Sequence, residues 1–141
     1  MKVANLINGK AVQTISPSAS INDLLNSLAH HHVGALVVST DGKHIDGIVS
    51  ERDVVRALPN KLNDALSITV SDLMTSEVVT CTKDTAISEL MKTMTNQRVR
   101  HVPVVDDDGL LVSIVSIGDV VKRHIESLDT ERQALQDYIN S

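Results

Sequence analysis

Two serine–aspartate pairs with identical spacing are the residues of this sequence best suited to chemistry. Ser50 precedes Asp53 by three positions, and Ser116 precedes Asp119 in the same way. A serine at the start of a helix with an acid three residues later can form a capping box, although Glu or Gln is the usual acid partner. Beside the free amide groups of a helix N-terminus, the same side chains could instead bind a phosphate and grip the vicinal hydroxyls of a ribose. The spacing is compatible with both interpretations.

Basic residues gather before an apolar run in the second half of the chain. Arg98, Arg100 and His101 precede Val102 there. Charge-assisted hydrogen bonds to a phosphate contribute roughly 1.5–3 kcal/mol each, so two or three would supply much of a micromolar affinity of about −8 kcal/mol. The alternative is that Arg100 pairs with an aspartate of the neighbouring run 106–108. Two further arginines, Arg52 and Arg56, supply weaker positive charge beside Asp53.

Other candidate chemistries find less support. His30, His31 and His32 are consecutive, and successive helical side chains diverge by about 100°, so they cannot converge on one metal ion. Cys81 has no histidine close to it in sequence and is expected to be a small core residue. The run 106–108 before Gly109 lacks the spaced ligands of a calcium loop and predicts a turn. With no set of nucleophile, base and orienting group, we expect neither an enzyme nor a metal site.

Composition narrows the class of protein further. The 141 residues are 42% hydrophobic but include no Trp or Phe and one Tyr, so the core must consist of aliphatic residues, as in sheets covered by helices. A net charge of −5 and the lack of aromatic stacking platforms argue against nucleic-acid binding. No apolar run approaches the length of about 20 residues that spans a bilayer. A single cysteine and the absence of a secretory signal fit a reducing compartment, and we expect a cytoplasmic location.

The chain repeats itself at an offset of 66 residues, as from Ser50 to Ser116. Over residues 12–55 and 78–121 the two copies align without a gap, and 13 of the 44 pairs are identical. Such agreement at a constant offset indicates one supersecondary unit used twice. The largest difference is that Gly34 and Ala35 of the first copy correspond to Arg100 and His101 of the second.

Each copy predicts the same five elements. A short strand at 12–15 or 78–81 is followed by a helix with the i, i+3, i+4, i+7 apolar spacing, capped by Ser20 in the first copy and by Asp84 or Thr85 in the second. A hairpin follows, with strands at 35–38 and 44–49 or 102–105 and 111–115 around a Gly-containing turn. A final helix begins near Ser50 or Ser116. The unit is therefore βαββα.

A unit of roughly 50 residues buries too little surface to be stable alone, so the two copies should pack sheet to sheet about a pseudo-twofold axis. The predicted class is α/β (α+β), with unit 1 at residues 1–62 and unit 2 at 63–127. The link 59–72 should be a loop and then a short lead-in strand, with apolar spacing at Leu66, Ile68 and Val70. Residues 128–141 should form a terminal helix, which Leu128, Leu135 and Ile139 could either dock or dimerise.

These duplicated motifs resemble the tandem cystathionine β-synthase (CBS) domains called a Bateman module. The resemblance rests on a Val-Ser-x-x-Asp-Val-Val stretch after a strand in each copy, on 33–38 with 47–53, and on 72–75 with 100–106. It covers about residues 10–125. It implies two pseudo-symmetric clefts that bind AMP, ADP or ATP, or less often S-adenosylmethionine or NAD(H).

The resemblance also implies roles for individual residues. In a main cleft, Asp119 would bind ribose hydroxyls, Ser116 and Val115 would lie beside them, and Arg100 and His101 would contact phosphate; backbone groups of Gln13, Thr14, Ile15, Val33 and Gly34 would face adenine. In a second cleft, the corresponding residues would be Asp53, Ser50, Val49, Arg52, Val79, Thr80, Cys81 and Val99. Because Gly34 and Ala35 replace the basic pair, occupancy of the second cleft is in question.

The expected function is therefore that of a regulatory sensor and not of an enzyme. Such pairs commonly form face-to-face homodimers, and with no further domain expected, the signal would pass to a separate, unidentified protein. The alternative is a dimeric adaptor that binds no ligand, because members of this kind need not bind one.

Overall fold

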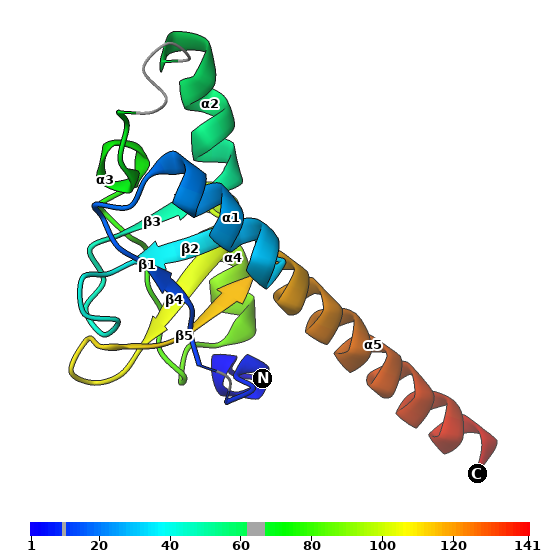
Figure 1. Cartoon of the computed structure of the whole chain (residues 1–141). Helices are drawn as coiled ribbons and strands as arrows, with labels where there is room; N and C mark the ends of the chain where they lie inside the picture. The colour runs from blue at the N-terminus through cyan, green and yellow to red at the C-terminus, as the bar shows by residue number, and fades with distance from the viewer. Residues whose placement is uncertain (10, 62–66) are drawn as a thin grey trace.

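The computed structural model describes residues 1–9, 11–61 and 67–141. In chain order the elements are η1 (Val3–Leu6), β1 (Thr14–Ile15), α1 (Ile21–His31), β2 (Ala35–Val38), β3 (Gly47–Ser50), α2 (Glu51–Lys61), α3 (Val70–Leu73), α4 (Ile87–Gln97), β4 (His101–Val105), β5 (Leu111–Ser116) and α5 (Ile117–Asn140). Figure 1 shows two small sheets surrounded by helices, with α5 extending away from the body. The mixed α/β class is confirmed.

The strand pairing repeats as the sequence predicts. In the first unit β1 pairs parallel to β2, and β2 pairs antiparallel to β3 with Ala35 opposite Ser50. In the second unit β4 pairs antiparallel to β5, with His101 opposite Ser116 at the equivalent register. The predicted strand 78–81 is reduced to a single parallel bridge between Cys81 and Val104. The hairpin turns are confirmed by positive φ angles of 79° at Gly42 and 78° at Gly109.

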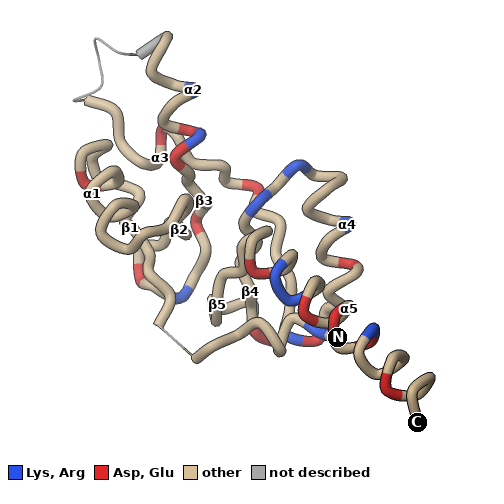
Figure 2. Tube along the Cα trace, turned by 90° about the vertical axis from the view of Figure 1, so that its right-hand side faces the viewer, with Lys and Arg blue, Asp and Glu red and all other residues tan. Residues whose placement is uncertain are grey.

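Strands β2 and β4 are buried on both faces of their sheets. Leu36 and Val38 of β2 belong to the same buried cluster as the apolar residues of α1. The residue between them, Val37, points to the opposite face because strand side chains alternate, yet it too is fully buried. Pro103 occupies the corresponding position in β4 and is also fully buried. The second face of each sheet is thus covered by the other unit, and in Figure 2 α1 and α4 lie on opposite outer sides of the strands.

The segments that lead into the two units are exchanged between their cores. Val3 of η1, near the start of the chain, is buried in the cluster of unit 2 with Leu90 and Val102. Ile68 and Val70, which belong to the lead-in segment of unit 2, are buried in the cluster of unit 1. The division at residues 62 and 63 therefore describes the sequence repeat but not the two cores. The boundary itself and Leu66 lie outside the described residues.

The predicted lead-in strand of unit 2 is wrong in type. Residues 70–73 form the short helix α3, because Thr69 and Asp72 make a capping box in which the Asp72 carboxylate accepts the Thr69 amide at 2.9 Å. The segment then crosses the edge of unit 1, where Thr75 exchanges two backbone hydrogen bonds of 2.9 Å with Ile48 of β3. This crossing carries Thr75 to the junction of the two units.

The terminal helix is not a separate element. One continuous helix of 24 residues, α5, runs from Ile117 to Asn140. Because α5 leaves the body, Leu128, Leu135 and Ile139 stay exposed, so the predicted docking of these residues on the described part of the chain is wrong (Figure 1). Their role in dimerisation remains a prediction.

Of the N-caps predicted for the first helix of each unit, one is confirmed and one is wrong. The Ser20 hydroxyl accepts the Asp23 amide at 3.0 Å and caps α1, as predicted. For α4 the prediction is wrong, since the N-cap position is Ala86 and no side chain caps it.

Candidate functional site

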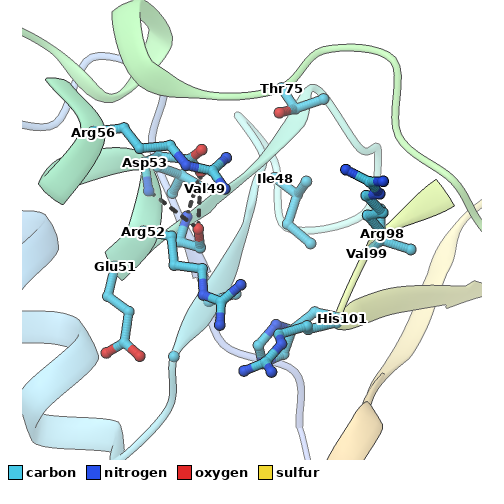
Figure 3. Close-up of a pocket in the computed structure, with 14 residues that line it drawn as sticks. Ile48, Val49, Glu51, Arg52, Asp53, Arg56, Thr75, Arg98, Val99 and His101 are labelled. Atoms are coloured by element: carbon cyan, nitrogen blue, oxygen red, sulfur yellow. Dashed lines mark hydrogen bonds between the residues drawn. The ribbon is translucent and has the colours of Figure 1, made fainter. Parts of the chain in front are cut away.

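A cavity of about 210 Å³ lies at the junction of the two units. Unit 1 contributes the end of β3 and the first turns of α2, and unit 2 contributes the end of α4 and the start of β4 (Figure 3). The start of β2 and the segment after α3 complete the lining, which consists of Gly34, Ala35, Ile48, Val49, Ser50, Glu51, Arg52, Asp53, Arg56, Thr75, Arg98, Val99, Arg100 and His101. The strand-to-helix turn between β3 and α2 of unit 1 thus faces the helix-to-strand turn between α4 and β4 of unit 2 across the cavity.

Asp53 caps α2. Its Oδ2 atom accepts the Ser50 amide at 2.8 Å and the Ser50 hydroxyl at 3.1 Å, and the Asp53 amide donates to the Ser50 hydroxyl at 3.3 Å (Figure 3). Asp119 makes the same box with Ser116, at 3.0 Å from the Ser116 amide to Oδ2 and 3.2 Å from the Asp119 amide to the hydroxyl. The capping interpretation is therefore confirmed in both copies.

Capping does not use up either carboxylate. Every hydrogen bond that the two carboxylates accept engages Oδ2, and within the described part of the chain the Oδ1 atom of Asp53 or Asp119 accepts none. A carboxylate oxygen has two acceptor sites and donates nothing, so each acid retains capacity for hydroxyl donors. Of the two, only Asp53 lines the cavity.

Four arginines line the same cavity. Arg52 and Arg56 extend from α2, and Arg98 and Arg100 lie just before β4 (Figure 3). Among the described residues none of the four forms an ion pair, so the alternative in which Arg100 pairs with an aspartate of 106–108 is not what the structure shows. Only two carboxylates, Glu51 and Asp53, accompany them in the lining. The cavity is thus locally basic in a chain whose net charge is −5.

His101 lies between the two units. It is half-buried at the start of β4, and its Cε1 atom lies 3.6 Å from where a Cβ atom on Gly34 would stand. Burial lowers the pKa of His101, while the negative charges of Asp119 and Glu51 act in the opposite direction and the charge of Arg100 reinforces the lowering. The ring is therefore neutral at pH 7 and can accept a proton when an anion binds nearby.

The structure regroups the predicted clefts. Arg100, His101 and Gly34, which were expected in the cleft of Asp119, line the cavity that contains Asp53, although the charge of Asp119 also acts on His101. The reason is that β4 starts at the junction of the two units, so its first residues face unit 1. The cleft expected to lack a basic pair therefore has one, supplied by the other copy.

Several predicted residues are not brought into this cavity. Ile15, Val115 and Cys81 are core residues, and burial raises the pKa of the Cys81 thiol to about 11. The residues outside the lining are Gln13, Thr14, Ile15, Val33, Val79, Thr80, Cys81, Val115, Ser116 and Asp119. Of the second-cleft prediction, Asp53, Ser50, Val49, Arg52 and Val99 are brought together.

The sequence prediction missed four residues of the lining, Ala35, Ile48, Glu51 and Thr75. Glu51 follows Ser50 directly, and its place inside the serine–aspartate motif could have indicated it. Thr75 reaches the cavity only because the lead-in segments are exchanged between the units. The repeat offset could not predict that exchange, because it says only which residues of the two copies are equivalent.

Two further features of the described chain bear on the class of protein. His30 and His31 end α1 and His32 follows with a φ of 55°, as a polar helix end would. No cluster of three or more metal-ligating side chains occurs in residues 1–9, 11–61 and 67–141. Over the same ranges no helix has the length and apolarity needed to cross a membrane.

Comparison with known proteins agrees with this architecture. The family model for the CBS domain matches twice, at residues 4–60 and 70–126. The CBS-domain-containing protein ATU1752 from Agrobacterium tumefaciens superposes with a TM-score of 0.82 at 38% identity, over 88% of this chain and 99% of that one. The CBS domain protein PAE2072 from Pyrobaculum aerophilum, solved in complex with AMP, has a TM-score of 0.74 at 26% identity, over 84% and 89%.

A plant relative completes the comparison. The mitochondrial CBS domain-containing protein CBSX3 of Arabidopsis thaliana is 38% identical over 124 residues, which are 85% of this chain. The chain spans about 60% of the length of that relative. With two family matches that cover both repeats, the chain belongs to the CBS-domain family and consists of a tandem CBS pair.

Proposed function

We propose that this CBS pair is a regulatory module that binds an adenine nucleotide, with AMP favoured over ATP, ADP, NAD(H) or S-adenosylmethionine, in the cavity beside Asp53. The observation that carries the proposal is the group of four arginines without ion-pair partners among the described residues, which line one cavity together with a carboxylate whose Oδ1 accepts no hydrogen bond there. Guanidinium groups suit phosphate, and the carboxylate suits ribose hydroxyls. The bound AMP in the structure of PAE2072 supports the choice of ligand class.

Each part of the nucleotide has a complementary surface in this proposal. The phosphate would lie among Arg52, Arg98 and Arg100, with His101 at the junction of the units. The ribose hydroxyls would donate to Oδ1 of Asp53, which keeps its Oδ2 cap on α2. The adenine would pack on Ile48 and Val99, the apolar part of the lining.

Regulation would follow from the position of the ligand between the units. A nucleotide that contacts α2 of unit 1 and β4 of unit 2 binds most tightly to one relative arrangement of the two, and it shifts the population toward that arrangement. We propose that a separate protein reads this shift, that the chain acts as a homodimer, and that it catalyses no reaction. A cytoplasmic location stays a prediction, and the plant relative is named as mitochondrial.

Calorimetric titration with AMP and adenosine tests the site. Arg100→Ala should weaken AMP about tenfold or more, through loss of a charge-assisted bond of roughly 1.5–3 kcal/mol, and should change adenosine little. Asp53→Ala should weaken both ligands because both carry the ribose. Equal weakening of AMP and adenosine by Arg100→Ala would contradict the phosphate role.

Asp119→Ala is the matched control, because Asp119 makes the same capping box but lies outside the cavity lining. Both aspartate variants should lose a similar stability of about 1 kcal/mol through the cap. Asp53→Ala should lose far more nucleotide affinity than Asp119→Ala, which only removes a charge that acts on His101. If nucleotide-free wild-type protein shows no thermal shift with AMP, ATP or NADH, the ligand-free adaptor is the better interpretation.

A further inference from the structure

Helix α5 carries a regular apolar row on its exposed surface. Val121, Ile125, Leu128, Arg132, Leu135 and Ile139 follow one another at alternating steps of four and three residues. We call these six residues the α5 seam. Its five apolar side chains are 44–75% exposed, with Ile139 the most exposed and Val121 the least. A strict 3.5-residue repeat of this kind is the pattern of a two-stranded coiled-coil interface and not of a helix packed on a globular core.

The α5 seam points away from the contacts that α5 makes with its own body. Val120 is fully buried in the core of unit 2, and successive helical residues are about 100° apart. Val121 and the rest of the seam therefore face roughly a quarter turn away from the attachment. Beyond the first turns α5 extends clear of the body, so the seam is open to another helix (Figure 1).

We propose that the α5 seam forms a parallel, two-stranded coiled coil with the α5 seam of a second copy of this chain. In heptad terms Ile125, Arg132 and Ile139 occupy the a positions, and Val121, Leu128 and Leu135 occupy the d positions. Ile at a with Leu at d favours a parallel dimer. The inference specifies the surface of the proposed homodimer and does not depend on nucleotide binding.

Charge complementarity determines the orientation. In a parallel pair the Arg132 side chain packs beside the g position of the other helix, where it meets the partner's Glu131. A single polar residue at an a position lowers stability but fixes the register. In the fully overlapped antiparallel pair, Asp129 and Glu131 would each lie beside their own copies, and like charges at such close range repel. The sequence of α5 therefore favours the parallel arrangement.

A matched pair of variants tests the surface. Leu135→Glu places a charge in the seam, whereas Ala134→Glu places the same charge at the neighbouring, exposed position outside it. In sedimentation of the full chain over a concentration series, Leu135→Glu should weaken self-association about tenfold or more, because the buried charge has no partner, and Ala134→Glu should not. A monomeric wild-type chain, or equal effects of the two variants, would overturn the proposal.

Cross-linking tests the orientation independently of any other contact between copies. Under oxidising conditions Ile139→Cys should form a disulfide-linked dimer, since parallel a positions face each other, whereas Asp137→Cys on the outer side should not. The buried Cys81 does not interfere. If Leu135→Glu dissociates the chain but Ile139→Cys does not cross-link, the parallel orientation is wrong. AMP affinity should be unchanged in all four variants, so failure of this proposal is distinct from failure of the nucleotide site.

Discussion

The Cε1 atom of His101 lies 3.6 Å from the point that a Cβ atom on Gly34 would occupy. These residues come from different units, and the offset of 66 residues pairs Gly34 with Arg100 and Ala35 with His101. The missing side chain of one copy thus leaves the space into which the other copy extends its imidazole. As a result, the basic residues Arg100 and His101 of unit 2 line the same cavity as the carboxylate of Asp53 in unit 1.

Two substitutions of Gly34 should distinguish the stability of the fold from the cavity space that the nucleotide needs. A Cβ atom would lie 3.4 Å from Oε1 of the exposed Glu51, an atom at the end of a flexible side chain, so Gly34→Ala should fold and gain up to about 1 kcal/mol from reduced freedom of the unfolded chain. Gly34→Leu should fill the cavity and abolish AMP binding. Thermal unfolding and calorimetry measure the two effects. Undiminished AMP affinity in Gly34→Leu would place the nucleotide elsewhere.

Gly47 should be far less tolerant than Gly34. A Cβ atom there would lie 2.6 Å from Sδ of Met74 and 2.9 Å from the carbonyl oxygen of Thr75, so the lead-in segment would have to move. We expect Gly47→Ala to lose about 1–3 kcal/mol of unfolding free energy in urea, as overpacked cores do. The displaced Thr75 should weaken AMP as well. If Gly47→Ala were as stable as the wild type, Met74 and Thr75 would not be packed closely against β3.

AMP affinity should rise as the pH falls from 8 toward 6. Burial keeps the pKa of His101 below its ordinary value of 6.5, and a phosphate beside the ring would raise it, so binding takes up a proton. Calorimetry in buffers of different ionisation enthalpy counts that proton, and His101→Gln should remove it. An unchanged pH dependence in His101→Gln would assign the proton to another group.

The same shift predicts the opposite trend for stability without ligand. Because the folded pKa of His101 is lowered, the unfolded chain binds the proton more readily once the pH falls below 6.5. The contribution of His101 to the unfolding free energy should therefore decline as the pH falls through that value. Urea titrations of the wild type and His101→Gln should diverge below this pH and agree above it.

Cys81 should be unreactive in the folded chain. Burial raises the pKa of its thiol from 9.0 to about 11, and thiolates are the reactive species. A thiol-specific reagent at pH 8 should label the native protein slowly and the urea-unfolded protein quickly. Since the unfolded thiol ionises first, stability should fall as the pH rises from 9 toward 11. Rapid native labelling would show that β4 opens away from the Cys81 segment.

Local patterns were sufficient to predict the repeated unit. The unit was predicted from periodic apolar residues, turn glycines and serine caps, which each determine the structure of only a few neighbouring residues. The equivalent positions of Ser50 and Ser116 followed from these signals. The continuity of α5 could also have been seen, because no proline and no glycine occurs after Gly118 to end the helix.

What could not be predicted depends on contacts between the copies. A repeat offset states which residues are equivalent, but not which copy a segment packs against. The exchange of Val3 and Val70 between the cores, and the placement of Arg100 beside Asp53, are both of this kind. Each is decided by how two similar sheets meet, which no spacing within one copy records.

The exchanged lead-in segments also set how the chain can unfold. Since Val3 fills the interior of the second half and Val70 fills that of the first, neither half can lose its packing without exposing apolar surface in the other. The two halves, produced as separate polypeptides, should fold only when mixed, and the intact chain should melt in a single transition despite its internal duplication.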